Sequence, residues 1–145
     1  MKNLIITSLL AVMVFASASA APKPVSSAIL TNFHIAYKRA SDICWSVTND
    51  YTKAMFTEDN AKIEVYYTFN GDVIGTSKNI ALDDLPLCAK RSFAKQFAGF
   101  TVKEAIRLDG FGEVAYYISG ENDKEAVILK VNEDNQVSLF TKTKK

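Results

Sequence analysis

Histidine is scarce in this sequence, with His34 as its single representative, and only two cysteines, Cys44 and Cys88, occur in 145 residues. A zinc site needs clustered Cys and His ligands, and these three residues lack the usual spacing. A serine hydrolase would need His34 beside both a nucleophile and an acid, and the Gly-x-Ser-x-Gly pattern is missing. We therefore expect no catalytic residue, no metal ligand and no cofactor, with His34 at the edge of a helix surface.

Clusters of acidic residues do not change this expectation. The segments "EDN" (58–60), "DD" (83–84) and "NEDN" (132–135) lack the ligand spacing of a twelve-residue calcium loop. Turns and helix ends account for them, because Asp and Asn favour both. No pair of carboxylates stands out as a glycosidase pair, although the many acids leave that question open.

Long apolar runs are limited to one, from Leu4 to Phe15. It follows Lys2 and precedes the small residues Ala18-Ser19-Ala20, which is the pattern of a cleaved secretory signal. We expect residues 1–20 to be a signal peptide, with cleavage after Ala20 or close by at Ala18 or Ala21. The run is short for a membrane span, so the mature chain, residues 21–145, is expected to have no membrane anchor and to be periplasmic or secreted.

An excess of basic residues is missing as well. The sequence has 17 Lys and Arg against 16 Asp and Glu, and removal of Lys2 with the signal leaves 16 of each. Nucleic-acid binding needs a basic surface, so the neutral balance argues against it. A mature chain of this length fits one domain or two small repeats that share a core.

The two cysteines allow two interpretations. A Cys44–Cys88 disulfide would be chemically possible after export, and closing a loop of roughly 45 residues would stabilise the fold by about 4 kcal/mol. However, alternation puts Cys44 on the strand face opposite Ile43, Trp45 and Val47, while Cys88 lies near the apolar stripe of a helix. Two separately buried thiols are the favoured interpretation, since sequence alone cannot fix the geometry.

Apolar periodicity predicts a helix followed by four strands in the first half. Leu30, Phe33, Tyr37 and Ala40 recur at helical spacing, which predicts a helix over about 26–39. The period then changes to two, and strands are expected at 43–47, 52–56, 63–69 and 72–79. Asn70-Gly71 is the strongest hairpin signal in the chain.

The second half predicts the same order again. "LDDLP" (82–86) resembles a helix start, because carboxylates and proline are both favoured in the first turn. Leu85, Ala89, Phe93 and Phe97 form an apolar stripe, and Gly99 ends the helix. Strands are expected over 101–108, 113–119, 124–131 and 136–142.

This order predicts two repeats, about 25–80 and 81–143. Phe33, Tyr37 and Ala40 match Phe93, Phe97 and Phe100 at an offset of 60, and Val65, Tyr67 and Phe69 match Val127, Leu129 and Val131 at an offset of 62. A meander with one apolar face is not stable alone, so each helix is expected to cover the meander of its own repeat. The predicted fold is α+β, with tandem helix-plus-four-strand antiparallel meanders, both helices on one sheet face and the other face open.

The stretch "FHIAYKRASDICW" resembles the helix-to-strand signature of the PepSY-like, beta-lactamase-inhibitor-like domain of secreted bacterial proteins. Phe33, Tyr37, Ala40, Ile43 and Trp45 occupy that pattern, and "DLP" (84–86), "FAGFTVKEA" (97–105) and the hairpin at "FNGD" (69–72) are similar as well. The resemblance covers nearly the whole mature chain. It implies a small α+β domain with a binding or inhibitory role and no assigned catalytic residues to carry over.

One departure concerns the second strand, where the family tends to place Tyr-x-Ala-x-Phe. Ala54 and Phe56 fit, but Thr52 stands where Tyr is expected, and Tyr51 lies one position earlier. A shift of one residue moves a side chain to the other sheet face. Either Tyr51 lines the outer face, or the strand contains a bulge.

The residues expected on the open face are mixed in character. The apolar and aromatic ones are Tyr51, Met55, Tyr66, Tyr117 and Ile128, interspersed with Lys53, Lys62, Glu64 and Lys130. Exposed aromatic residues among charges are typical of a protein-binding surface, and scattered apolar residues on an ordinary sheet are the alternative. Tyr51, Tyr66 and Tyr117 are the best candidates.

Two functions follow from these observations. The first is a non-catalytic exported binding module that binds, and by resemblance inhibits, a peptidase or another exported protein or peptide. The second is a periplasmic carrier or sensor that holds a small ligand in the concavity of the sheet. The oligomeric state stays open.

Overall fold

The computed structural model describes residues 23–145, so the predicted signal peptide lies outside the described residues. The first half contains α2 (Ser27–Ala36), β1 (Ser41–Val47), β2 (Thr52–Glu58), β3 (Ala61–Tyr67) and β4 (Val73–Asn79). The second half contains the 3₁₀ helix η1 (Leu82–Asp84), α3 (Leu87–Gln96), β5 (Thr101–Gly110), β6 (Glu113–Glu121), β7 (Glu125–Asn132) and β8 (Val137–Lys144). The class is α+β, as predicted.

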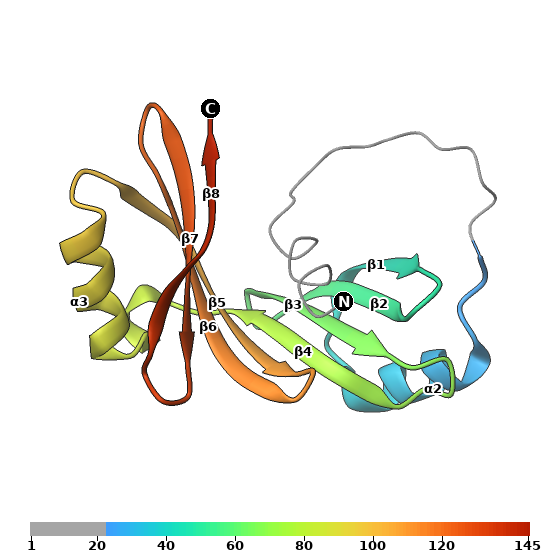
Figure 1. Cartoon of the computed structure of the whole chain (residues 1–145). Coiled ribbons are helices and arrows are strands. Elements are labelled where there is room, and N and C mark those ends of the chain that lie inside the picture. Colours follow the sequence, from blue (N-terminus) through green and yellow to red (C-terminus); the bar gives the residue numbers. More distant parts are fainter. Residues whose placement is uncertain (1–22) are drawn as a thin grey trace.

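All eight strands form one antiparallel sheet in chain order, β1 to β8. The pairing register shows that both helices cover the same face. Val65, which packs against α2, pairs with Thr76, and Thr76 pairs with Asp109. Four residues before Asp109 on the same side of β5 lies Ala105, which packs in the α3 cluster. Figure 1 shows the sheet bent between its two ends, with α2 and α3 on its outer side.

Helix α2 begins where the sequence predicts and ends earlier. The Ser26 hydroxyl accepts a hydrogen bond from the backbone N–H of Ile29 and so caps the first turn. The helix ends at Ala36, because Tyr37 leaves helical geometry at φ −120° and ψ 67°. Phe33 is fully buried, in ring contact with Trp45 and Phe56 at centroid distances of 5.1 and 5.0 Å.

The start of α3 differs from the prediction. Asp83 and Asp84 belong to the short helix η1, and Pro86 is the N-cap of α3 rather than a residue of its first turn. Proline disfavours helical geometry in the residue before it, and Leu85 is indeed extended, at φ −69° and ψ 144°. The acids therefore lie one short turn away from the helix whose N-terminus they were expected to neutralise.

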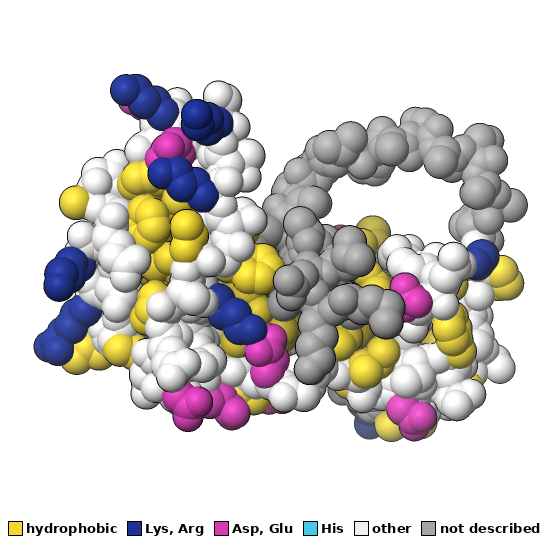
Figure 2. Space-filling model, in the orientation of Figure 1, with side chains coloured by type: hydrophobic (Ala, Val, Ile, Leu, Met, Phe, Trp, Pro, Cys, Tyr) yellow, Lys and Arg dark blue, Asp and Glu magenta, His cyan; other side chains and the backbone are white. Residues whose placement is uncertain are grey.

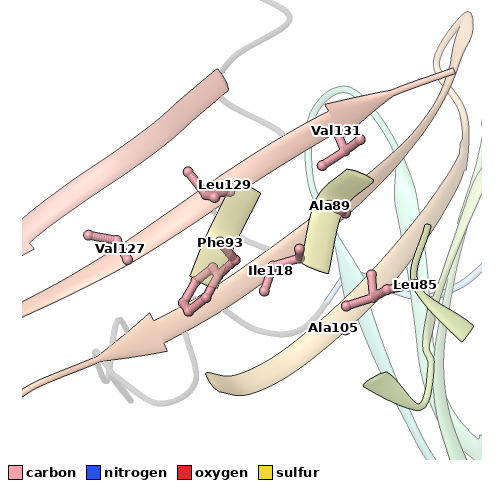
Figure 3. Close-up of a cluster of buried hydrophobic side chains, with 8 residues drawn as sticks. All are labelled: Leu85, Ala89, Phe93, Ala105, Ile118, Val127, Leu129 and Val131. Carbon is pink, nitrogen blue, oxygen red and sulfur yellow. The ribbon is translucent and has the colours of Figure 1, made fainter. Parts of the chain in front are cut away.

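Each helix is held to the sheet by an apolar core. Under α2 the core contains Ile29, Phe33, Ala54, Phe56, Ile63, Val65 and Tyr67. Under α3 it contains Leu85, Ala89, Phe93, Ala105, Ile118, Val127, Leu129 and Val131, and Figure 3 shows Ala89 and Phe93 of α3 directed toward the strands. Full burial of one such side chain contributes about 1.5–3 kcal/mol, so the predicted aromatic spacing marks the helix faces that hold the fold together.

The third-strand match was predicted with the wrong offset. In the observed register Trp45 pairs with Ala54, and Ala105 pairs with Ile118. If Trp45 is matched with Ala105 at an offset of 60, their strand partners Ala54 and Ile118 match at an offset of 64. The same offset of 64 holds in the third strands, where the buried residues Ile63, Val65 and Tyr67 match Val127, Leu129 and Val131. Phe69 was expected to match Val131, but it follows the end of β3 and is 54% exposed. The offset grows because the hairpin β5–β6 has longer strands (10 and 9 residues) than β1–β2 (7 and 7), which a single offset could not anticipate.

The cysteines are free and far apart in the fold. Cys44 is exposed on β1, and Cys88 is half-buried on α3 with its Sγ 3.1 Å from Oδ1 of Asn135. The expectation of two separate thiols agrees with this arrangement, but the expectation that both are buried is wrong. Cys44 is exposed because β1 is an edge strand whose register shifts between Ser41 and Cys44.

Candidate binding surface

The sheet face away from the helices carries its own apolar cluster, which we name the open face. Its members are Tyr51, Tyr66, Ile74, Ile106, Leu108, Phe111, Ala115, Tyr117, Ile128 and Phe140. Within residues 23–145 no helix packs on this face, and Figure 2 shows hydrophobic side chains gathered there with charged side chains beside them. The cluster joins both halves of the sheet, because it draws on strands from β3 to β8.

Strand alternation places the aromatic residues of β3 on opposite faces. Tyr67 packs in the α2 core, and its neighbour Tyr66 therefore lies on the open face. The ring of Tyr51 contacts Tyr66 at 5.3 Å between centroids, and Phe111 contacts it from β5–β6 at 5.2 Å. Of the two possibilities for Tyr51, the outer-face position is the one observed.

The ammonium group of Lys53 lies over the ring of Tyr66. Lys53 pairs with Tyr66 across β2 and β3, and its Nζ lies 5.7 Å from the ring centroid. The same Nζ is 3.4 Å from Oε1 of Glu64, while the Tyr66 hydroxyl donates to Oε2 of Glu64 at 2.6 Å. The Lys53 side chain is only 8% exposed, so its charge is compensated by a carboxylate and an aromatic ring instead of water.

The second half contains a matching arrangement. Lys130 pairs with Tyr117 across β6 and β7, and its Nζ lies 5.9 Å from the ring centroid and 2.5 Å from Oε2 of Glu113. Here the tyrosine hydroxyl is buried. Burial first, and the charge of Glu113 second, raise the pKa of Tyr117 well above its ordinary value of 10. The face thus presents two lysine–tyrosine pairs, one on each side of the sheet's centre.

Phe111 is held in an unusual backbone conformation between these two pairs. Its φ of +56° lies in the left-handed region, which bulky residues rarely adopt. Gly112 follows with φ +82°, so the two residues form a tight β5–β6 turn. A Cβ on Gly75 would lie 2.7 Å from Cε2 of Phe111, which means that the ring rests directly on the backbone of β4. Packing on Gly75 and Tyr66 holds this strained residue against the open face.

The predicted surface residues divide into two groups. Tyr66 and Tyr117 lie on the predicted face, but they are 0% and 1% exposed, so the expectation that they are exposed is wrong. Tyr51, Met55 and Ile128 are half-buried and retain accessible surface. The two buried tyrosines are covered by neighbouring rings and by aliphatic lysine chains, a packing that strand alternation does not reveal.

Six members of the face were not predicted from the sequence, namely Ile74, Ile106, Leu108, Phe111, Ala115 and Phe140. Phe140 contacts Tyr117 at 5.3 Å between ring centroids, and it lies at a register shift between β7 and β8. A bulge re-aims a side chain, so simple alternation assigned Phe140 to no face. Phe111 lies in the β5–β6 turn. The sequence feature that marks this turn is Gly112, which follows it.

The histidine and the acidic residues of the described chain do not form a metal site. His34 is exposed on α2, as predicted, with its ring centroid 5.6 Å from that of Phe33. Among residues 23–145 no three His, Cys, Asp or Glu side chains gather as ligands for a metal ion. The same residues include no helix with the length and apolar character needed to cross a bilayer.

Comparison with protein-family models gives no match, and comparison with curated proteins gives none either. Solved structures do match. A Bacteroides eggerthii protein described as a candidate periplasmic protein superposes with a TM-score of 0.72 at 14% identity, over 84% of this chain and 90% of that one. A BLIP-like protein from Bacteroides fragilis gives 0.64 at 21% identity, over 84% and 87%. A DUF2874 family protein from Bacteroides ovatus gives 0.66 at 17% identity, over 87% and 89%. The chain therefore shares the fold of BLIP-like and DUF2874 structures along most of its described length.

Proposed function

We propose that this protein is a non-catalytic exported binding module that engages another exported protein or peptide through the open face. The observation that carries the proposal is an aromatic cluster spread over strands of both halves on the sheet face that no described helix covers. Protein-binding surfaces are enriched in Tyr, Phe and Met and contain few unpaired charges at their centre. The open face contains three Tyr and two Phe residues, and Lys53 and Lys130 are each paired to a glutamate.

The accessible residues Tyr51, Met55 and Ile128 are the proposed contacts. The buried residues Tyr66 and Tyr117 serve as the support on which these contacts rest. A binding surface gains from such rigid aromatic support, because less conformational freedom is lost when a partner docks. We thus assign two different roles to the candidate residues, accessible contact and buried support.

Two finer features belong to the same proposal. Likeness to a BLIP-like structure and to a candidate periplasmic protein supports an inhibitory role and a periplasmic or secreted location. Membership of the PepSY-like group is proposed from the motif residues alone, because the fold does not distinguish PepSY-like from BLIP-like proteins. The target is proposed to be a peptidase or another exported enzyme.

Tandem duplication is proposed as the origin of the fold. Supporting it, α2 and α3 are both ten residues long, and both end where an aromatic N–H bonds back to a phenylalanine carbonyl: Tyr37 to Phe33 at 2.8 Å and Phe97 to Phe93 at 2.9 Å. The next turn repeats as well, with N–H groups of Ala40 and Phe100 bonding to Tyr37 and Phe97 at 3.3 and 3.0 Å.

The test compares variants that change accessible residues without emptying the core. A Tyr51→Ala, Met55→Ala, Ile128→Ala triple variant should lose its partner in affinity purification from the cell envelope. A matched control that changes exposed helix-side residues, Ile35→Ala and Leu87→Ala, should retain the same partner. Equal recovery of every partner by both proteins would reject the open face as the binding surface.

A further inference from the structure

The two helices meet different surroundings at equivalent positions. Under α2, Phe33 packs edge-on against Trp45 and Phe56, two large rings. In the observed register the corresponding positions under α3 hold Ala105 and Gly120. Two large rings are thus replaced by a methyl group and a hydrogen atom.

Phe93 occupies part of the space that these small residues leave. A Cβ on Gly120 would lie 2.3 Å from Cζ of Phe93, so the ring lies directly against the β6 backbone. The ring of Phe93 contacts that of Phe97 at 5.6 Å between centroids, and Phe97 contacts Phe100 at 5.3 Å. Under α2 the aromatic neighbours of Phe33 come from the strands. Beside α3 the aromatic neighbours, Phe97 and Phe100, come from the end of the helix and the residues that follow it.

A groove opens on that flank. It has a volume of about 470 Å³ and runs between α3, η1 and the strands β5 and β6. Phe93, Phe97, Phe100, Val102 and Ile118 make its lining mostly apolar. This volume falls in the range of small-molecule sites, and apolar and aromatic walls are typical of them.

The mouth of the groove carries one cation. Lys90 lines it, and its Nζ is fixed there by donating to the backbone oxygen of Asp83 at 2.9 Å. The Asp83 carboxylate is 3.9 Å from this Nζ and fully exposed, so the pair contributes little energy and an incoming anion can replace it. An apolar cleft with a displaceable cation at its mouth is complementary to a molecule with an apolar tail and one acidic end.

We infer that the groove beside α3 is a binding site for small aliphatic carboxylates of medium chain length, the tail against the phenylalanines and the carboxylate at Lys90. This site lies on the helix side of the sheet and is independent of the open face. Its failure would leave the proposed protein-binding role untouched.

The experiment titrates the purified protein with decanoate and with decanol, both below the concentration at which they aggregate, and follows methyl NMR signals. Decanoate should shift Ile118 and Val102 saturably and leave Ile128 and Ile106 of the open face unmoved. Lys90→Gln should weaken decanoate about two- to fivefold, the range of an exposed charge pair, and leave decanol binding unchanged. Lys95→Gln, on the same helix but outside the groove, is the matched control and should change neither.

A second variant tests the groove itself. Ala94 is exposed on α3 and lines the groove, so Ala94→Phe should block it without disturbing the core. We expect at least a tenfold loss for both ligands, while Ala36→Phe at an exposed site on α2 should have no effect. The proposed site would be overturned by NMR shifts confined to Ile128 and Ile106 or by the lack of any saturable shift. Full ligand binding by Ala94→Phe would overturn it as well. Lys90→Gln without effect on decanoate would overturn the assignment to carboxylates.

Discussion

Tyr66 and Tyr67 are neighbours in β3, and replacing each by Phe should have opposite effects on stability. Both are buried, with exposed fractions of 0% and 1%. The Tyr66 hydroxyl donates to a Glu64 carboxylate oxygen at 2.6 Å, whereas the Tyr67 hydroxyl is buried without a hydrogen-bond partner. The two substitutions delete the same atom, in one case with its hydrogen bond to a carboxylate and in the other with no hydrogen bond.

The magnitudes follow from the cost of a buried polar group. A hydrogen bond to a charged group is worth about 1.5–3 kcal/mol, so Tyr66→Phe should lower the free energy of unfolding by that amount. Burying an unpaired hydroxyl costs about 1–3 kcal/mol, so Tyr67→Phe should leave the free energy of unfolding unchanged or raise it by about 1 kcal/mol.

Urea unfolding measures both changes. Trp45 is the only tryptophan and packs against Phe33 in the α2 core, so its fluorescence reports the transition. With a urea slope of about 1–3 kcal/mol per molar, Tyr66→Phe should lower the midpoint by about 1 M. Destabilisation of Tyr67→Phe to the same extent as Tyr66→Phe would refute the reasoning, because it would mean that the Tyr67 hydroxyl has a partner.

The same residue predicts a pH dependence. Burial, with a smaller contribution from Tyr37, raises the pKa of Tyr67 to about 12 from an ordinary 10. A raised pKa in the folded state stabilises the fold fully below pH 10, and this stabilisation is lost as pH rises toward 12. Tyr67→Phe should therefore flatten the decline in stability between pH 10 and 12, and an unchanged decline would contradict the assignment.

Three further predictions concern other parts of the fold. Gly120→Ala should cost about 1–3 kcal/mol in urea unfolding, because the new methyl would collide with Phe93, and a neutral effect would contradict the close packing. Hydrogen bonds from Lys103, and then from Lys145, lower the pKa of Glu121 to about 2. Its carboxyl NMR signal should therefore titrate near pH 2, and Lys103→Ala should raise that midpoint toward 4.5. Exposed Cys44 should react with a thiol reagent faster than the half-buried second cysteine, and equal rates would count against the described edge strand.

Much of the fold could be predicted because the helices and strands each show their own apolar periodicity. Phe33 and Phe93 each belong to an apolar stripe with helical spacing, and both are buried under their helices. Val65 and Tyr67 alternate with solvent-side or open-face residues, as a strand requires. These signals are local, since each depends on residues within one element. The open face could be predicted for the same reason, and Tyr66 and Tyr117 do lie on it.

What the sequence could not supply depends on contacts between elements. Leu85, which Pro86 keeps extended, packs in the core under α3, so η1 and α3 are separate helices. The burial of Tyr66 arises from Tyr51 and Phe111, which come from different hairpins. Phe93 lies directly on the β6 backbone at Gly120, a contact that only the strand register reveals.

The most direct test of the open face is site-specific photocrosslinking in the producing cell. A photoreactive residue at Met55 or Ile128 should form a protein adduct, and Tyr51→Ala in the same chain should reduce its yield. The same residue at Ile35 or Leu87, exposed on the helix side, should form no such adduct. Adducts that form at Ile35 or Leu87 and not at Met55 or Ile128 would contradict binding through the open face.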